Sequence, residues 1–176
     1  MKRLLRLLVL VILTGAVWMA WQAFAPHPLP PPQAAAVEQI DRILIEKSAR
    51  RLTASRGGET VLEFPIALGF DPSGDKFQEG DGKTPEGVFQ IDRRNPNSAY
   101  HLSLGINYPQ PADMAQARAA GVSPGGDIFI HGQPNSVGNL ITLPGDWTAG
   151  CIAVSNEQME TLWRLTQLGT EVEIRP

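Results

Sequence analysis

Apolar and polar residues alternate in short runs over most of the chain, which is typical of strands and not of long helices. Three runs follow one another at 42–47, 51–55 and 60–68, and Gly57-Gly58 before the third favours a tight hairpin turn. Pro65 in the third run predicts an edge strand or a bulge, because proline cannot donate to a central ladder. The pattern therefore predicts a mainly β domain that opens with a meander.

Further strands are predicted by short apolar runs in the second part of the chain. These runs lie at 87–91, 101–106, 127–130, 151–154 and 170–174. The segment 70–86 is rich in Gly, Asp and Pro, and it predicts a long loop between the meander and these strands.

Two segments favour short helices. Residues 112–120 are rich in alanine and stop at Gly121, as a surface helix does when glycine follows its end. Ser155 and Gln158 have the spacing of a capping box. Apolar residues then recur at helical spacing and predict a face packed on the core rather than a ligand site. They are Met159, Leu162, Trp163 and Thr166.

The first residues follow a different pattern. Lys2, Arg3 and Arg6 precede an uncharged run from 7 to 21, which predicts an export segment with the rest of the chain across the membrane. Residues 1–25 are therefore expected to be a signal peptide or an uncleaved membrane anchor. Pro26 would follow a cleavage site at Ala25 and disfavours cleavage there, so we favour the anchor.

Residues 26–39 are rich in Pro and Ala, and they are expected to form an extended, semi-rigid linker. Residues 40–176 then make one domain of ordinary size. The pattern places this domain in the periplasm, held at the inner membrane by its N-terminal segment.

Composition narrows the possible partners. A net charge of −3 without basic patches argues against nucleic acid. The chain has one cysteine, Cys151, so it cannot form an intramolecular disulfide. One cysteine and two histidines outside the linker, with no close acidic partner, also do not make a metal site, so no metal or cofactor is expected.

Three motifs look functional but lack a required part. GDGKT at 80–84 has phenylalanine where a phosphate loop needs its first glycine. The segment 71–75 resembles the start of a calcium loop, yet Lys76 replaces the turn glycine. The nucleophile-elbow pattern at 121–125 has Pro124 after its serine, and proline offers no N–H to an oxyanion.

Cys151 is a stronger candidate for a catalytic residue than these three motifs. His131 stands at the end of a predicted strand, and a loop joins it to the cysteine. A histidine base within reach converts an inert thiol into a nucleophile. Gly150 lets the chain turn tightly and expose N–H groups beside Cys151, as an oxyanion site requires.

The segments IHG and DWTAGCIAVSN resemble the L,D-transpeptidase (YkuD-type) catalytic domain, whose signature is a histidine, a spacer and then [S/T]-H-G-C. His131, Thr148, Gly150 and Cys151 match that signature. The upstream segments RRLTASRGGETVLEFPIALG, GDGKTPEGVFQI and NPNSAYHLSLGINYP resemble the family's opening meander and its T-P-x-G strand. The resemblance covers nearly all of 40–176 and implies a YkuD-like β-sandwich or meander with a few short helices.

The sequence departs from the family pattern beside the cysteine. Ala149 stands where most members carry a histidine, and Ile152-Ala153 replaces the usual Ile-Arg. The chain is in this respect most similar to the murein endopeptidase-like branch, whose members release wall-linked protein and lack the second histidine. Nucleophile and base are intact, so the departure bears on substrate contacts and on the acceptor.

The resemblance implies acyl transfer on peptidoglycan stem peptides, in cell-wall remodelling and cell shape. Cys151 would attack the carbonyl of the L-centre of diaminopimelate and form a thioester, with His131 as base. The carbonyl of Gly132 would orient the base, and the N–H groups of Gly150 and Cys151 would hold the oxyanion. Further substrate contacts are expected from His101, Trp147 and Thr148.

Three alternatives remain open from the residues. Water instead of an amine would make the enzyme an endopeptidase or carboxypeptidase that releases wall-linked protein or a D-amino acid. A non-catalytic wall-binding module would bury Cys151 as packing. A redox-sensing thiol would need a resolving cysteine from another molecule.

Overall fold

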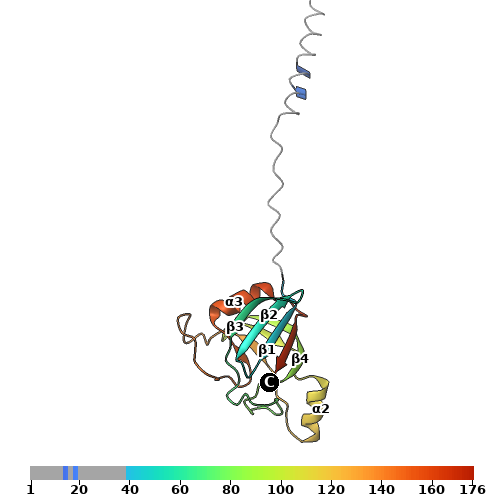
Figure 1. Cartoon of the computed structure of the whole chain (residues 1–176), viewed down its shortest axis with the longest axis vertical. Helices are drawn as coiled ribbons and strands as arrows, with labels where there is room; N and C mark the ends of the chain where they lie inside the picture. The colour runs from blue at the N-terminus through green and yellow to red at the C-terminus, as the bar shows by residue number, and fades with distance from the viewer. Residues whose placement is uncertain (1–13, 16–17, 20–38) are drawn as a thin grey trace, which may run out of the picture. The chain divides into compact units, whose positions relative to one another are not determined.

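The computed structural model describes residues 14–15, 18–19 and 39–176, and Figure 1 shows the whole chain. The expected export segment and the linker at 26–39 lie almost wholly outside the described residues. Within the described part, no helix is both long and apolar enough to cross a membrane. The following description concerns the unit Val37–Pro176.

Eight strands form one hydrogen-bonded series in the order β3-β2-β1-β8-β4-β5-β6-β7. The strands are β1 (Arg42–Glu46), β2 (Arg51–Arg56), β3 (Glu59–Pro65), β4 (Gly87–Ser98), β5 (His101–Ile106), β6 (Phe129–His131), β7 (Ile152–Ala153) and β8 (Glu171–Arg175). The mainly β prediction is confirmed. The strands make one connected mixed sheet, because the long β4 pairs with β8 through its first part and with β5 through its second.

The opening meander is confirmed. β2 pairs antiparallel with both β1 and β3, while β1 also pairs in parallel with β8. β3 lies at one edge of the series, and Pro65 is its last residue, where its missing N–H is tolerated. Alternating positions of β1 and β2 are fully buried, which places their apolar side chains on one core-facing surface.

Two helices occur in the described part, α2 (Pro111–Ala119) and α3 (Asn156–Leu165). The capping box of α3 is confirmed, because the Ser155 hydroxyl accepts from the Gln158 N–H and the Gln158 side chain accepts from the Ser155 N–H. Met159 and Leu162 are fully buried, so the predicted core face is also confirmed. α3 packs against β5 and β6, and Figure 1 shows α2 at the other end of the domain.

The strands β5, β6 and β7 carry the region of interest. Ser103 on β5 pairs with His131 on β6, and His131 in turn pairs with Ala153 on β7. The segment between β6 and β7 projects beyond the sheet in Figure 1. It brings Cys151 back beside β6 immediately before β7 begins.

Candidate active site

His131 and Cys151 line one cavity of about 440 Å³. The other lining residues are Asn95, Ser98, Ala99, Tyr100, Ser103, Asp127 and Phe129. β6 supplies His131, and the segment before β7 supplies Cys151. The parallel pairing of β6 with β7 keeps both residues on one face of the sheet. A cavity of this size is within the range of small-ligand sites.

His131 is held in one orientation by its own neighbour. Its Nδ1 atom lies 2.7 Å from the carbonyl oxygen of Gly132. The Nδ1–H donates to this oxygen, which leaves Nε2 as an unprotonated acceptor. The imidazole is buried, and burial lowers its pKa although the Gly132 carbonyl acts in the opposite direction. His131 is therefore neutral near pH 7, as a proton acceptor must be.

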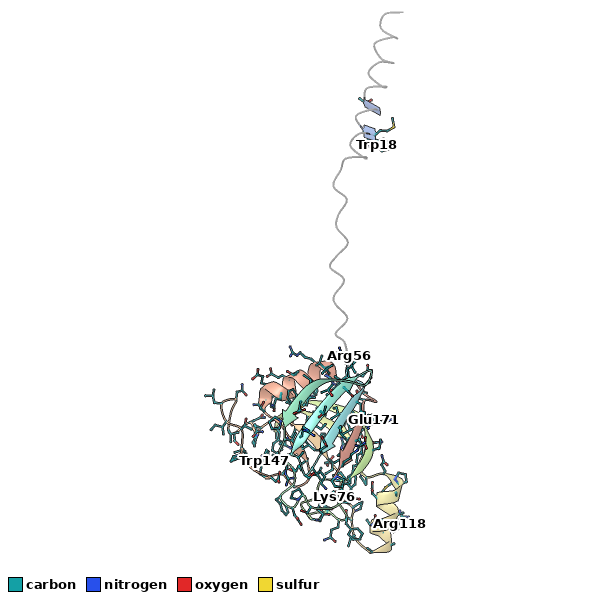
Figure 2. All side chains as sticks on the ribbon, in the orientation of Figure 1. Trp18, Arg56, Lys76, Arg118, Trp147 and Glu171 are labelled. Atoms are coloured by element: carbon teal, nitrogen blue, oxygen red, sulfur yellow. The ribbon has the colours of Figure 1, made fainter. Side chains whose placement is uncertain are left out.

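Two aromatic rings flank the imidazole. The ring centroids of Tyr100 and Trp147 lie 4.5 Å and 5.7 Å from that of His131. Figure 2 shows Trp147 on the side of the domain from which the loop before β7 projects. Trp147 contacts the expected base and is not among the residues that line the cavity, whereas Tyr100 lines it. Sequence reasoning did not single out Tyr100, which has no motif of its own.

The chain after His131 is fixed by two buried amides. The Gln133 N–H donates to Asn156 Oδ1 at 2.7 Å, and Gln133 Nε2 donates to the Val154 carbonyl at 2.7 Å. A Cβ atom at Gly132 would lie 2.5 Å from Asn156 Oδ1, so this position needs glycine. Asn156, the first residue of α3, therefore supports the segment next to His131.

The Cys151 thiol is half-buried and points toward the segment before β6. Its Sγ atom lies 3.4 Å from the Asp127 carbonyl oxygen, to which the thiol donates. Burial raises the pKa of Cys151, and the Asp127 carboxylate adds to this, while the Phe129 N–H acts in the opposite direction. The cavity thus holds a neutral thiol and a neutral imidazole. This arrangement suits general-base activation during attack and not a stored thiolate.

Thr148 builds the turn that carries the cysteine. Its buried hydroxyl donates to the Cys151 carbonyl at 2.7 Å and accepts from the Gly150 N–H at 3.1 Å. The expected oxyanion donor at Gly150 is therefore already engaged, whereas the turn does not use the Cys151 N–H. The geometry gives Thr148 a structural task in place of the expected substrate contact.

Gly150 still needs to be glycine. Its φ is +136°, and a Cβ atom there would lie 2.7 Å from the Lys83 carbonyl oxygen. The close approach ties the turn to the loop before β4, where Thr84 Oγ1 accepts from the Gly69 N–H. The position of the turn from Thr148 to Cys151 thus depends on its packing against the loop that leads into the T-P-x-G segment at 84–87.

The structure does not bring His101 to the cavity. It is the first residue of β5 with a φ of +65°, and its Nε2 atom lies 2.9 Å from Glu160 Oε1 on α3. The backbone N–H of His101 donates to Asn135 Oδ1 at 2.8 Å. The expected contact between His101 and a substrate carboxylate has no support in this geometry. The imidazole does not line the cavity, and it is hydrogen-bonded to the carboxylate of Glu160.

No group of three or more His, Cys, Asp or Glu side chains within the described part is placed to hold a metal ion. The cavity instead holds a thiol and an imidazole with a fixed tautomer, the two groups that thiol-based acyl transfer uses. Those groups can form and break an acyl bond without a further group.

Comparisons with known proteins show which family the sequence and fold resemble. The sequence pattern of the YkuD family, the L,D-transpeptidase catalytic domain, matches residues 40–174. YafK of Escherichia coli (strain K12) is 27% identical over 93 residues, which cover 52% of this chain and 31% of YafK. The chain therefore spans about a third of the length of this curated relative.

Solved structures show the same fold. The helical cell shape determining protein Pgp2 from Campylobacter jejuni has a TM-score of 0.59 and 28% identity, over 78% of this chain and 48% of Pgp2. Bd1075 from Bdellovibrio bacteriovorus has a TM-score of 0.55 and 27% identity, over 81% of this chain and 50% of its own. The L,D-transpeptidase from Mycobacterium smegmatis, at 16% identity and a TM-score of 0.52 over 77% of this chain and 58% of its own, shows the fold alone.

Proposed function

The chain belongs to the YkuD family of L,D-transpeptidase catalytic domains, and from this premise we propose that it catalyses acyl transfer on peptidoglycan stem peptides through a thioester on Cys151. One observation carries the proposal. His131 and Cys151 line the same cavity, and the Nδ1–H bond to Gly132 leaves Nε2 of the base to take a proton.

Attack and proton transfer are coupled in the proposed first step. His131 Nε2 accepts the thiol proton while Cys151 Sγ forms a bond to the carbonyl carbon of the L-centre of diaminopimelate. The Cys151 N–H stabilises the oxyanion, and a donor in such a position contributes roughly 3 kcal/mol in comparable acyl-transfer sites. The C–N bond then breaks, the imidazolium returns its proton to the leaving amine, and a D-amino acid departs from the thioester.

The second step depends on the acceptor. An amine of a second stem peptide would give a cross-link, and water would give a free carboxylate. Ala149 and Ala153 have no ionisable group at the positions where most family members carry a histidine and an arginine. In this respect the chain is similar to the murein endopeptidase-like branch. Hydrolysis that frees a wall-linked protein or a D-amino acid is the alternative outcome of the same acyl-enzyme.

We further propose that the domain works in the periplasm, anchored by residues 1–25. The support is the arrangement of Lys2, Arg3 and Arg6 ahead of an uncharged run. A C-terminal epitope on the full chain should be digested by protease in spheroplasts and should stay with the membrane after carbonate washing. Protection of the epitope would overturn the location, and release by carbonate would overturn the anchor.

Intact mass tests the catalytic proposal. The full chain in mild detergent is mixed with a synthetic stem tetrapeptide that ends in diaminopimelate and D-alanine. We expect an adduct of the tripeptide acyl group and release of D-alanine. Cys151→Ala should abolish both, and His131→Ala should slow acylation on the order of 100-fold.

His101→Ala is the matched control, because it removes a histidine that does not line the cavity. This variant should acylate as the wild type does. If the folded wild-type protein binds peptidoglycan but forms no adduct and releases no D-alanine, the result would favour the non-catalytic wall-binding module. Reaction with added amine acceptors then separates cross-linking from hydrolysis.

A further inference from the structure

The register of the strands places a charged side chain in the row that leads to the nucleophile. Arg93 on β4 pairs with Gly105 on β5, and Gly105 pairs with Phe129 on β6. Cys151 precedes the β7 residue that pairs with Ile130, so it continues this row beside Phe129. Paired residues of neighbouring strands point to the same face of a sheet. Arg93, Phe129 and Cys151 therefore share the face that holds the cavity.

Gly105 lets the arginine cross a strand. A Cβ atom at this position would lie 2.5 Å from both Cγ and Nε of Arg93, so the side chain of Arg93 lies across the bare backbone of β5. The guanidinium carbon is 4.7 Å from the centroid of the Phe129 ring. The charge consequently lies over β6, one strand spacing, or about 4.8 Å, from the strand of Cys151.

Asp127 places the opposite charge at the same rim. Arg93 Nη2 is 3.3 Å from Asp127 Oδ1, while the backbone carbonyl of Asp127 accepts a hydrogen bond from the Cys151 thiol. Asp127 adopts a φ of +54°, a conformation that is uncommon outside glycine. Its side chain is 85% exposed, and that of Arg93 is 43% exposed.

This ion pair contributes little to folding. Exposed pairs are screened by water and are worth roughly 0–1 kcal/mol. The other carboxylate near the guanidinium, Asp92, is 3.7 Å away and also exposed. Asp127 and Phe129 line the cavity, and Arg93 contacts both of them from outside the lining. The two opposite charges are therefore placed where they can meet a ligand that extends from Cys151.

We propose that Arg93 and Asp127 form the specificity site for the free amino-acid end of the acyl donor. This inference rests on the proposed function. The D-centre of diaminopimelate carries a carboxylate and an ammonium, three methylene groups away from the L-centre whose carbonyl Cys151 attacks. Arg93 binds the carboxylate through paired N–H donors, Asp127 binds the ammonium, and Phe129 packs under the methylene groups.

Three stem tetrapeptides test the carboxylate contact with the full chain. They contain diaminopimelate, diaminopimelate with an amidated D-centre carboxylate, or lysine, which keeps the ammonium and lacks the carboxylate. The measured quantity is kcat/KM for release of D-alanine. The wild type should prefer the free carboxylate over both analogues by about tenfold, the effect of one lost charge-assisted contact.

Arg93→Gln should remove this preference by slowing only the stem with the free carboxylate. The amidated stem then reports that the variant still folds and acylates. Arg164→Gln, which removes an exposed arginine on α3, should keep the wild-type preference. Asp127→Asn should lower the rate with the free ammonium and leave unchanged the rate with a stem whose D-centre amine is acetylated.

Two results would overturn the specificity site. One is that the wild type is acylated at equal rates by the stems with a free and with an amidated D-centre carboxylate. The other is that Arg93→Gln keeps the preference for the free carboxylate. Failure of the proposed function looks different, because none of the stems would then release D-alanine.

Discussion

The Nδ1 atom of His131 lies 2.7 Å from the carbonyl oxygen of Gly132, the next residue in the chain. A backbone carbonyl therefore does what a carboxylate does in many catalytic triads, which is to fix the tautomer of the base. It carries no full negative charge, so it stabilises an imidazolium less than a carboxylate would. Burial lowers the pKa of His131 and raises that of Cys151, so the imidazole is neutral at rest and the thiol in the same cavity keeps its proton.

The pH dependence of alkylation should reveal this neutral pair. Burial raises the pKa of Cys151, so the rate of reaction with iodoacetamide should keep rising above about pH 8.5, the range of a free thiol. Alkylation followed by intact mass between pH 5 and pH 10 measures it. A rate that is already maximal near pH 5 would show a stored thiolate–imidazolium pair instead.

Acylation by the stem peptide should lose rate at low pH. Burial lowers the pKa of His131, so the base stays neutral through about pH 6.5 and becomes protonated only below that value. The kcat/KM for D-alanine release should therefore be flat at neutral pH and fall only at a pH below the ordinary range of a histidine. Loss of rate already at pH 7 would contradict the lowered pKa.

Thr148→Val should destabilise the turn that carries the nucleophile. The substitution keeps the branched shape and removes the hydroxyl that bonds the Gly150 N–H and the Cys151 carbonyl. We expect a loss of about 2 kcal/mol in the free energy of unfolding by urea, together with slower acylation. Thr148→Ser keeps the hydroxyl and is the control, so equal losses in both variants would refute the role of the hydrogen bonds.

Gly132→Ala should disturb the support of the base. The new Cβ would lie 2.5 Å from Asn156 Oδ1, and that oxygen already accepts from the Gln133 N–H. A loss of about 1–3 kcal/mol in unfolding free energy and a fall in kcat at unchanged KM are expected. Gly126→Ala is the matched control, because its Cβ would meet only Pro109 Cδ at 3.8 Å. Equal effects at both glycines would argue against the steric explanation.

Tyr100→Ala should slow acylation by about tenfold without abolishing it. The ring lies 4.5 Å from the imidazole and limits its movement, and such positioning has effects of this order. Tyr100→Phe keeps the ring and should react as the wild type does. An equal loss in the phenylalanine variant would instead assign the effect to the hydroxyl.

The local sequence determined much of the fold. Alternation of apolar residues placed β1, β2 and β8 within one or two residues of their observed bounds, and the Ser155–Gln158 spacing placed the start of α3. These features depend on neighbours in the chain, so a local pattern is sufficient to predict them. β4 exceeded its predicted end and continued to Ser98, because its second part is held by pairing with β5 and not by its own apolar pattern.

The candidate pair could also be found in the sequence, because a lone cysteine near a histidine has a restricted chemistry. The sequence alone did not determine which other side chains meet that pair. Tertiary structure turned His101 toward Glu160 and laid Arg93 across Gly105. Each of these contacts depends on side-chain direction and strand register between segments distant in the chain, and no local pattern of apolar and polar residues specifies those.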